Sequence, residues 1–257
     1  MNLLLLHDED FAPDGTVLLA GRRLLHAREV LQAAQGDLLR VGHLGGKIGT
    51  GEILHLDDRE LRLRATFDQE PPPRAGVDLL LAIPRPKALR RLLPALAALG
   101  VDRIVLVNAA RVEKSYFGSD VLSADVVQNL FVLGLEQARD TIAPQLLVRD
   151  RFRPFVEDEL ETLFTGAAHR WLAHPAAGHD AWRLPSPSAE ARVILAVGPE
   201  GGWVPFEVQL LESRGFRSFT LGPRILRVET VVPLLLGQVG LLRRRGAAES
   251  TSTSGEA

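Results

Sequence analysis

A run of three prolines, Pro71–Pro73, divides the sequence into two parts that have different patterns of apolar residues. Proline has a fixed φ and no backbone N–H, so such a run fits neither the interior of a helix nor a central strand. We therefore expect residues 70–76 to form a linker. Because a chain of 257 residues is long enough for two cores, we expect one domain over residues 1–72 and a second over residues 75–245.

The part before the linker has the pattern of a small β domain. Short segments that favour strands are separated by clusters of Gly, Asp and His, and a helical segment at residues 26–34 lies upstream of them. The expected strands are residues 36–43, 47–56 and 60–66. Short strands at this spacing are typical of a small β-barrel of roughly 70 residues.

The part after the linker alternates between strand and helix patterns. The expected strands are residues 78–83, 103–107, 170–173, 193–197 and 218–221. The expected helices are residues 87–99, 124–139, 206–213 and 229–242. This alternation predicts an α/β domain with a mainly parallel sheet. Residues 246–257 have no apolar side chain larger than alanine, which predicts a disordered tail.

The composition excludes several classes of protein. The absence of cysteine rules out disulfides, thiol catalysis and cysteine metal sites. His174 and His179 lie near Asp180 without the spacing of a zinc site, so no metal is expected. There is no run of 18 apolar residues and no signal-peptide pattern at the start, which predicts a cytoplasmic protein without a membrane span. The net charge of −2 leaves RNA binding to local basic patches.

A glycine-rich loop follows one of the expected buried strands. Val193–Val197 leads directly into Gly-Pro-Glu-Gly-Gly at residues 198–202, and a helix is expected after this loop. Glycines at the C-terminal end of a strand let the backbone approach a ligand closely and leave peptide N–H groups free to bind it. The glycine spacing is that of neither a P-loop nor a Rossmann fingerprint. Taken alone, the loop is explained more simply as a tight turn between a strand and a helix.

A second glycine loop ends the next expected strand. Residues 222–230 are Gly-Pro-Arg-Ile-Leu-Arg-Val-Glu-Thr. Two parallel strands that each end in such a loop form a ligand site where they lie side by side. Arg224, Arg227 and Glu229 flank the start of the last expected helix. A carboxylate at a helix N-terminus also complements the helix dipole, so Glu229 has a purely structural interpretation as well.

Together the two loops resemble the last two signature motifs of the 16S rRNA (uracil(1498)-N(3))-methyltransferase family, RsmE, within the SPOUT superfamily. The match covers Val-Gly-Pro-Glu-Gly-Gly-Trp at residues 197–203 and Leu-Gly-Pro-Arg-Ile-Leu-Arg-Val-Glu-Thr at residues 221–230. The resemblance extends weakly over most of the chain. Residues 26–31 with Gly36-Asp37 are similar to the family's PUA-like RNA-binding domain, and Glu136-Gln137 matches a motif of its second domain.

This resemblance implies a particular fold and cofactor. The fold would be α/β, with a SPOUT methyltransferase domain that has a C-terminal trefoil knot, preceded by a small PUA-like β-barrel domain. Family members are homodimers that use S-adenosyl-L-methionine and release S-adenosyl-L-homocysteine. The implied cofactor residues lie in three loops and are Leu172, Ala173, His174, Val197, Gly198, Pro199, Glu200, Gly201, Gly202, Leu221, Gly222, Ile225, Leu226, Arg227 and Thr230.

The implied reaction needs a proton acceptor. Uracil N3 carries a proton at neutral pH, so its methylation needs a base, or a cation that stabilises the uracil anion. Arg227 and Arg224 are the candidate cations, and Glu229 and Glu200 are the candidate bases.

The implied partner is 16S rRNA of the small ribosomal subunit. The candidate RNA contacts are Lys87, Arg111, Lys114, Ser115, Tyr116, Gln137 and Arg139. Tyr116 and Phe117, beside Lys114, are suited to stack on an unpaired base. The alternative for these residues is a solvated charged surface with an aromatic pair that only packs.

Several segments depart from the family pattern. Gln32 stands where the family has arginine, residues 95–99 differ from the usual Lys-Ala-Thr-Glu-Leu, Lys114-Ser115 replaces Arg-Ser, and Arg139 falls one residue early. These segments lie on the expected RNA-facing surface. Two alternatives therefore stay open: a SPOUT methyltransferase that acts on another rRNA or tRNA site, and a non-catalytic RNA-binding or ribosome-assembly protein.

Overall fold

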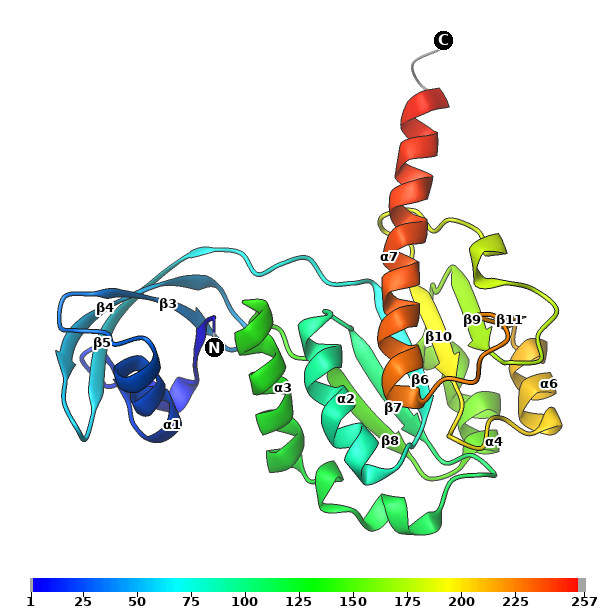
Figure 1. Cartoon of the computed structure of the whole chain (residues 1–257), viewed down its shortest axis with the longest axis horizontal. Helices are drawn as coiled ribbons and strands as arrows, with labels where there is room; N and C mark the ends of the chain where they lie inside the picture. Colours follow the sequence, from blue (N-terminus) through cyan, green and yellow to red (C-terminus); the bar gives the residue numbers. More distant parts are fainter. Residues whose placement is uncertain (1, 254–257) are drawn as a thin grey trace. The chain divides into compact units, whose positions relative to one another are not determined.

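The computed structural model describes residues 2–253, which form two compact units (Figure 1). One unit comprises Met1–Pro73 and Gln128–Ala143, and the other comprises Arg74–Val127 and Pro144–Ala257. The expected linker over residues 70–76 has no regular secondary structure. The assignment of residues 128–143 to the N-terminal unit differs from the expected division at the proline run, because this segment makes long-range contacts with the first residues of the chain.

The N-terminal unit contains a five-stranded sheet with the order β1-β3-β4-β5-β2. Its strands are β1 Leu4–Leu6, β2 Val17–Leu19, β3 Leu38–His43, β4 Ile48–Leu56 and β5 Leu61–Gln69. The β1–β3 pair is parallel and the other pairs are antiparallel. Strands β3, β4 and β5 correspond to the expected ones, whereas β1 and β2 were not expected. The short helix α1 (Gly21–Leu25) and the π-helical turn His26–Val30 lie between β2 and β3.

Buried and exposed side chains alternate along the strands of this sheet, and the buried ones form the core of the unit. Leu39 and Val41 of β3, and Leu61 and Leu63 of β5, are buried, and they pack with Leu24 of α1. Alternate residues of a strand point to the same face, so these side chains share one side of the sheet.

Helix α3 (Ala124–Ala138) contributes a buried charge to the same unit. Glu136 is 2% exposed, and its Oε2 accepts a hydrogen bond at 2.9 Å from Nη2 of Arg22. The backbone carbonyl of Glu136 also accepts a hydrogen bond from the N–H of Asn2 at 3.1 Å. The Glu136-Gln137 motif is therefore attached to the start of the chain by both side-chain and backbone contacts.

The second unit contains a six-stranded sheet with the order β11-β9-β10-β6-β7-β8. Its strands are β6 Val77–Ala82, β7 Arg103–Val107, β8 Gln145–Arg149, β9 His169–Ala173, β10 Val193–Val197 and β11 Arg217–Phe219. All neighbouring pairs are parallel. The predicted α/β architecture is confirmed, and the C-terminal ends of β11, β9 and β10 lie next to one another.

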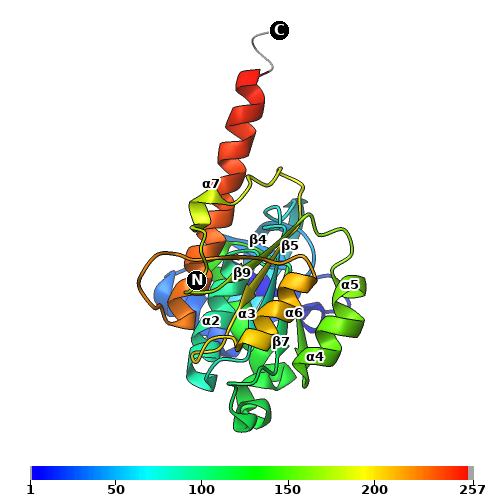
Figure 2. The ribbon, with the colours of Figure 1, turned by 90° about the vertical axis from the view of Figure 1, so that its right-hand side faces the viewer.

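Helices cover both faces of this sheet (Figures 1 and 2). The helices of the unit, besides the start of α3, are α2 Pro86–Ala98, α4 Phe152–Pro154, α5 Leu160–Leu163, α6 Pro205–Ser213 and α7 Val228–Thr253, with a π-helical turn over Phe155–Glu159. One face packs against α4–α6, with Phe155, Leu160 and Leu211 in its core. Helices α2 and α7 lie on the other face. None of the helices in the described part of the chain is long and apolar enough to cross a membrane.

Helix α7 extends over residues 246–253, the first part of the segment for which a disordered tail was expected. The segment contains no proline, so its backbone N–H groups can continue the helix that begins at Val228. Residues 254–257 lie outside the described residues. Arg243 of α7 donates hydrogen bonds to the carbonyls of Ala75, Gly76 and Ala191, which lie near the starts of β6 and β10.

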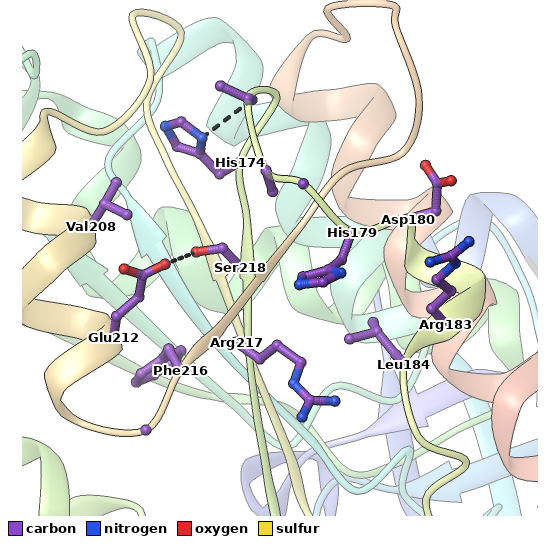
Figure 3. A pocket seen from close by; sticks show the side chains of 14 residues that line it. His174, His179, Asp180, Arg183, Leu184, Val208, Glu212, Phe216, Arg217 and Ser218 are labelled. Carbon is purple, nitrogen blue, oxygen red and sulfur yellow. Dashed lines mark hydrogen bonds between the residues drawn. The ribbon is translucent and has the colours of Figure 1, made fainter.

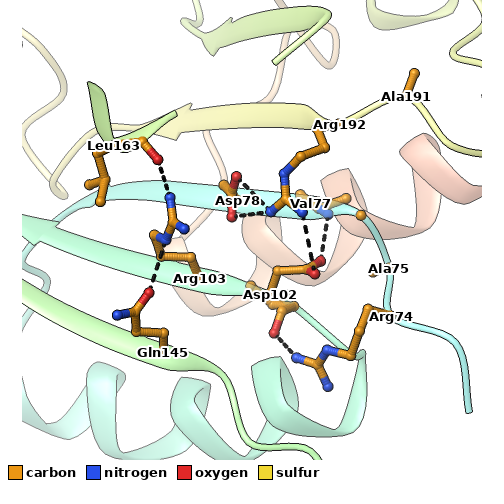
Figure 4. A network of polar contacts seen from close by, with 12 residues as sticks. Arg74, Ala75, Val77, Asp78, Asp102, Arg103, Gln145, Leu163, Ala191 and Arg192 are labelled. Atoms are coloured by element: carbon orange, nitrogen blue, oxygen red, sulfur yellow. Dashed lines mark hydrogen bonds and ion pairs between the residues drawn. The ribbon is translucent and has the colours of Figure 1, made fainter. Parts of the chain in front are cut away.

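A buried carboxylate lies at the N-terminal end of the same sheet (Figure 4). Asp78 of β6 is 1% exposed and accepts two hydrogen bonds from Nη2 of Arg192, at 2.8 and 2.9 Å. Burial raises the pKa of Asp78 above its ordinary value of 3.8, and the neighbouring Arg192 only partly offsets this effect. Asp102 lies 3.7 Å from Arg192, and its Oδ2 accepts the backbone N–H of Val77 at 3.0 Å.

Candidate functional site

Three loops meet at the C-terminal ends of β9, β10 and β11. The N–H of His174, directly after β9, donates to the carbonyl of Phe219 at 2.9 Å. The loop after β9 then returns to the end of β11, where Thr220 donates to the carbonyl of His179 at 2.8 Å and accepts from the N–H of Ala181 at 2.9 Å. The loops that follow β9 and β11 are therefore joined by backbone hydrogen bonds, beside the glycine loop that follows β10.

A cavity of about 190 Å³ lies between these loops. Its lining residues are Ala173, His174, Pro175, Val197, Gly198, Pro199, Glu200, Gly201, Gly202, Trp203, Phe219, Thr220, Leu221, Gly222, Arg224, Ile225, Leu226, Val228 and Val231. The wall is mainly apolar side chain and glycine backbone, with one carboxylate and one guanidinium. This composition suits a ligand that has an apolar ring and a polar or charged end.

The glycine loop after β10 is a tight turn. The N–H of Gly202 donates to the carbonyl of Pro199 at 2.8 Å, and Gly202 has a φ of +71°, which side chains other than that of glycine rarely adopt. A Cβ on Gly198 would lie 3.1–3.2 Å from the backbone nitrogen and the indole ring of Trp203. The two glycines therefore serve different purposes: one permits the turn, and the other permits close packing of the tryptophan.

Two side chains outside the loop hold it in place. The carboxylate of Glu207, at the third position of α6, is 3% exposed. Its oxygens accept the N–H groups of Val204 at 2.9 Å and of Ala110 at 2.7 Å. The guanidinium of Arg111 donates to the carbonyl of Gly201. The segment after β7 is thereby connected to the C-terminal part of the glycine loop and to the start of α6.

Most of the residues predicted to bind a cofactor lie together on this cavity. They are Ala173, His174, Val197, Gly198, Pro199, Glu200, Gly201, Gly202, Leu221, Gly222, Ile225 and Leu226. Of the four predicted catalytic residues, Glu200 and Arg224 also line it. The Oε1 atom of Glu200 accepts the backbone N–H of Arg85 at 3.0 Å, which holds this carboxylate at the start of α2.

The other predicted residues are not on the cavity wall. Leu172 is fully buried in the core that β9 shares with α4–α6. Arg227 and Thr230 are exposed at the start of α7. Glu229 is half-buried, and its Oε1 lies 3.8 Å from Nη1 of Arg91 in α2.

Several lining residues were not predicted from the sequence. Phe219 and Thr220 end the strand before the second glycine loop, and Val228 and Val231 are three residues apart on the first turn of α7. That spacing places two side chains on one face of a helix and was the available signal. Trp203 also lines the cavity, and its indole N–H is buried without a hydrogen-bond partner among the described residues.

The predicted RNA contacts are divided between the two units. Lys87, Arg111, Lys114 and Ser115 are exposed in the second unit, and Tyr116 is half-buried in the 3-10 turn Lys114–Gly118. Gln137 and Arg139 are exposed and belong to the N-terminal unit. The guanidinium of Arg111 donates a hydrogen bond to the carbonyl of Gly201 in the glycine loop. The sequence did not indicate this contact.

A second, larger cavity of about 820 Å³ lies beside the first (Figure 3). His174 lines both cavities. His179 and Asp180, which precede the residue that bonds to Thr220, are on the wall of the larger one. There, the hydroxyl of Ser218 donates to the carboxylate of Glu212 at 2.5 Å.

Comparison with known proteins places the chain in a family. The sequence model described as "RNA methyltransferase domain" matches residues 70–240, two thirds of the chain. The chain is 28% identical over 234 residues to the ribosomal RNA small subunit methyltransferase E of Treponema pallidum, which covers 90% of this chain and 87% of that protein. It is 26% identical over 256 residues to the protein of the same name from Mycobacterium bovis, covering 94% of this chain and 93% of the relative.

Solved structures agree with this relationship at the level of the fold. The ribosomal RNA small subunit methyltransferase E of Neisseria gonorrhoeae, crystallised with S-adenosyl methionine, superposes with a TM-score of 0.73 and 22% identity, covering 94% of this chain and 98% of that one. A putative methyltransferase from Legionella pneumophila, also in complex with S-adenosyl methionine, gives a TM-score of 0.72 at 22% identity, covering 95% and 97%. The resemblance drawn from the two glycine loops is confirmed: the chain belongs to the RNA methyltransferase domain family.

Proposed function

We propose that this protein transfers a methyl group from S-adenosyl-L-methionine to N3 of a uracil in 16S rRNA, at the position equivalent to uracil 1498. The observation that carries the proposal is the cavity formed by the loops after β9, β10 and β11, which brings the two sequence motifs together. The relatives named ribosomal RNA small subunit methyltransferase E match over most of their length. Their name supports the small-subunit RNA as the substrate.

The cavity suits this cofactor. Phe219, Leu226 and Val231 provide an apolar surface for an adenine ring, and the glycine backbone of residues 198–202 provides polar groups at close range. The indole N–H of Trp203 is buried on the same wall and has no partner within residues 2–253, so it is a donor that a ligand acceptor can satisfy. When bound, S-adenosyl-L-methionine supplies an electrophilic methyl group. The protein must then position the uracil and remove the proton from N3.

Glu200 and Arg224 are our candidates for that task. Both line the cavity, so both can reach a base placed beside the cofactor. One oxygen of Glu200 accepts the N–H of Arg85, which leaves the other oxygen to accept the N3 proton. Arg224 is exposed and can offset the charge of the uracil anion. Arg227 and Glu229 are proposed to act from the start of α7, where Nη1 of Arg91 lies 3.8 Å from Oε1 of Glu229.

The finer features of the family fold are part of the proposal. The hydrogen bonds that tie Thr220 to His179 and Ala181 support a C-terminal trefoil knot, since they place the end of β11 against the earlier loop. The five-stranded sheet of the N-terminal unit supports a PUA-like barrel domain. We further propose that the protein is a cytoplasmic homodimer, as the family resemblance implies.

The test is methylation of small ribosomal subunits isolated from a strain that lacks this gene. We expect the protein and labelled S-adenosyl-L-methionine to produce 3-methyluridine in the 16S rRNA, measured by mass spectrometry of the digested nucleosides. Label in a different nucleoside would assign another target. Absence of both label and cofactor binding at millimolar concentration would favour a non-catalytic RNA-binding protein.

The proposed base is tested by Glu200→Gln. We expect kcat to fall by about 100-fold or more, while the Kd for the cofactor, measured by calorimetry, stays within a factor of a few. Glu190→Gln is the matched control, because Glu190 is an exposed carboxylate of the same unit that is not on the cavity wall. Full activity of both Glu200→Gln and Glu229→Gln would exclude the two carboxylates as the base.

A further inference from the structure

The N-terminal unit has a cavity of its own, far along the sequence from the glycine loops. The cavity is about 280 Å³ in volume. It is lined by Asn2, Leu3, Leu4, His26, Leu31, Leu38, Leu39, Arg40 and Arg139, all of which belong to this unit. No carboxylate is among these lining residues. The cavity thus combines two guanidinium groups with a leucine surface.

The two arginines differ from the other basic residues of the unit. Ion pairs engage the side chains of Arg22, Arg23, Arg28, Lys47, Arg62 and Arg64. The guanidiniums of Arg40, Arg59 and Arg139 have no ion pair or hydrogen bond among the described residues. Two of these three unpaired cations line one cavity, and the residues that line it include no carboxylate to pair with them.

The apolar part of the cavity wall is also unusual. Leu38 is 68% exposed and Leu31 is 44% exposed, although most large apolar side chains of the unit are buried. Leu38 and Arg40 are two residues apart on β3, so both point from the same exposed face of the strand. A ligand that covers the leucines would therefore meet the Arg40 guanidinium at its edge.

The backbone around the cavity is strained. Among residues 2–253, a positive φ at a residue other than glycine occurs at Gln32 (+51°) and at Arg139 (+59°). Arg139 is on the cavity wall and Gln32 directly follows Leu31, which is also on it. Such conformations are concentrated at ligand sites, where the surrounding structure maintains them. The buried Nε2 atom of His26, another lining residue, has no hydrogen-bond partner among the described residues.

We propose that this cavity binds one unpaired nucleotide of the RNA substrate. The base lies against Leu31 and Leu38, where Nε2 of His26 is the polar group available to the base edge, and the adjoining phosphates bind Arg40 and Arg139. A paired base cannot enter, because its faces and edge are covered by the duplex. This inference rests on the proposed function for the identity of the ligand as RNA, and it adds a specific subsite in the N-terminal unit.

The test uses the full chain and a fluorescein-labelled single-stranded RNA of ten uridines, with anisotropy as the readout. We expect Arg40→Gln combined with Arg139→Asn to weaken binding by about 10-fold and to reduce the slope of log K against log salt by about 1.4, the value for two lost phosphate contacts. Asparagine is chosen at position 139 because it tolerates a positive φ. Arg59→Gln is the matched control, an unpaired cation of the same unit outside the cavity, and we expect it to bind normally.

Three further measurements separate an unpaired nucleotide from a general phosphate site. Leu38→Ser should weaken binding of the single strand by at least threefold, and a duplex of the same uridines with adenines should compete poorly. After irradiation of an RNA that contains 4-thiouridine, the cross-linked peptide should fall within residues 26–40. Wild-type affinity in the double arginine variant, or equal competition by the duplex with no effect of Leu38→Ser, would overturn the proposal.

These binding measurements need no methyl transfer, so they test the nucleotide subsite independently of the proposed reaction. If the protein methylates small subunits but the double variant has the same KM as Arg59→Gln, only the subsite is wrong. If it methylates nothing but binds the single strand through Arg40 and Arg139, the subsite remains and the proposed reaction is wrong.

Discussion

The carboxylate of Glu207 accepts a hydrogen bond at 2.7 Å from the backbone N–H of Ala110, a residue 97 positions earlier in the chain. The same carboxylate accepts the N–H of Val204 at 2.9 Å and is almost completely buried. One side chain therefore fixes both the start of α6 and the segment after β7, on which Arg111 contacts the glycine loop.

Glu207→Ala should reduce the free energy of unfolding by about 2–4 kcal/mol, because two buried N–H groups lose their charged acceptor. Cofactor affinity should fall in the same variant, since the segment after β7 then holds the glycine loop only through the bond from Arg111 to Gly201. Urea unfolding and calorimetry measure the two effects. Gln209→Ala, which truncates an exposed polar side chain of the same helix, should change stability by less than about 0.5 kcal/mol. Equal stability of the two variants would contradict the assigned role of Glu207.

Gly202→Ala should destabilise the loop without any steric clash. Gly202 has a φ of +71°, and a Cβ built there meets nothing within 4 Å, so backbone conformation is the only cost. We expect a loss of about 1–2 kcal/mol for alanine. Gly202→Asn should lose less, because asparagine tolerates this conformation better. A loss that is the same for both variants would show that the turn is not maintained in solution.

Trp203 should report cofactor binding by fluorescence. Its indole lines the cavity with a buried and unpartnered N–H, whereas Trp182 is 62% exposed and is not on that wall. Trp203→Phe should abolish most of the fluorescence change on addition of S-adenosyl-L-methionine, and Trp182→Phe should retain it. If the indole N–H binds the ligand, the Kd should also rise by about 2- to 10-fold in Trp203→Phe, the range for one hydrogen bond.

Asp78 should make stability depend on pH in a defined direction. Its folded pKa is raised above 3.8 by burial, so the folded state binds this proton more tightly than the unfolded state does. The contribution of Asp78 to stability is therefore greatest below pH 3.8 and declines as the pH rises through the folded pKa. Asp78→Asn removes the titrating group, so its destabilisation relative to the natural protein should be larger at pH 4 than at pH 7, measured by urea unfolding. The opposite trend would mean that the ion pair with Arg192 dominates.

Much of the second unit followed from local patterns in the sequence. Strands at 103–107 and 193–197 have the bounds that were expected, because each contains at least four consecutive apolar residues and is followed by a polar residue or glycine. Strand β8 (Gln145–Arg149) was not expected, since its residues are mostly half-buried and alternate little. The three residues of β1 and of β2 are likewise too few for a periodic signal.

The sequence predicted those parts of the cavity wall in which a glycine-rich loop directly follows a buried strand. Glycine loops after buried strands identified most of the cavity wall, because backbone exposure at a strand end is a local property. Arg224 lines the cavity, whereas Arg227 and Thr230 do not. This difference depends on the direction of the backbone where α7 begins at Val228, which a local sequence pattern does not specify. The pairing of Glu136 with Arg22, 114 residues apart, is a tertiary contact that no spacing rule indicates.

The hydrogen bonds of Arg243 join the last helix to the strands at the centre of the sheet. Its guanidinium donates to the carbonyls of Ala75, Gly76 and Ala191, residues that lie just before β6 and β10. Local opening of α7 therefore removes hydrogen bonds from the starts of both strands, so hydrogen exchange at the N-terminal ends of β6 and β10 should follow the opening of this helix.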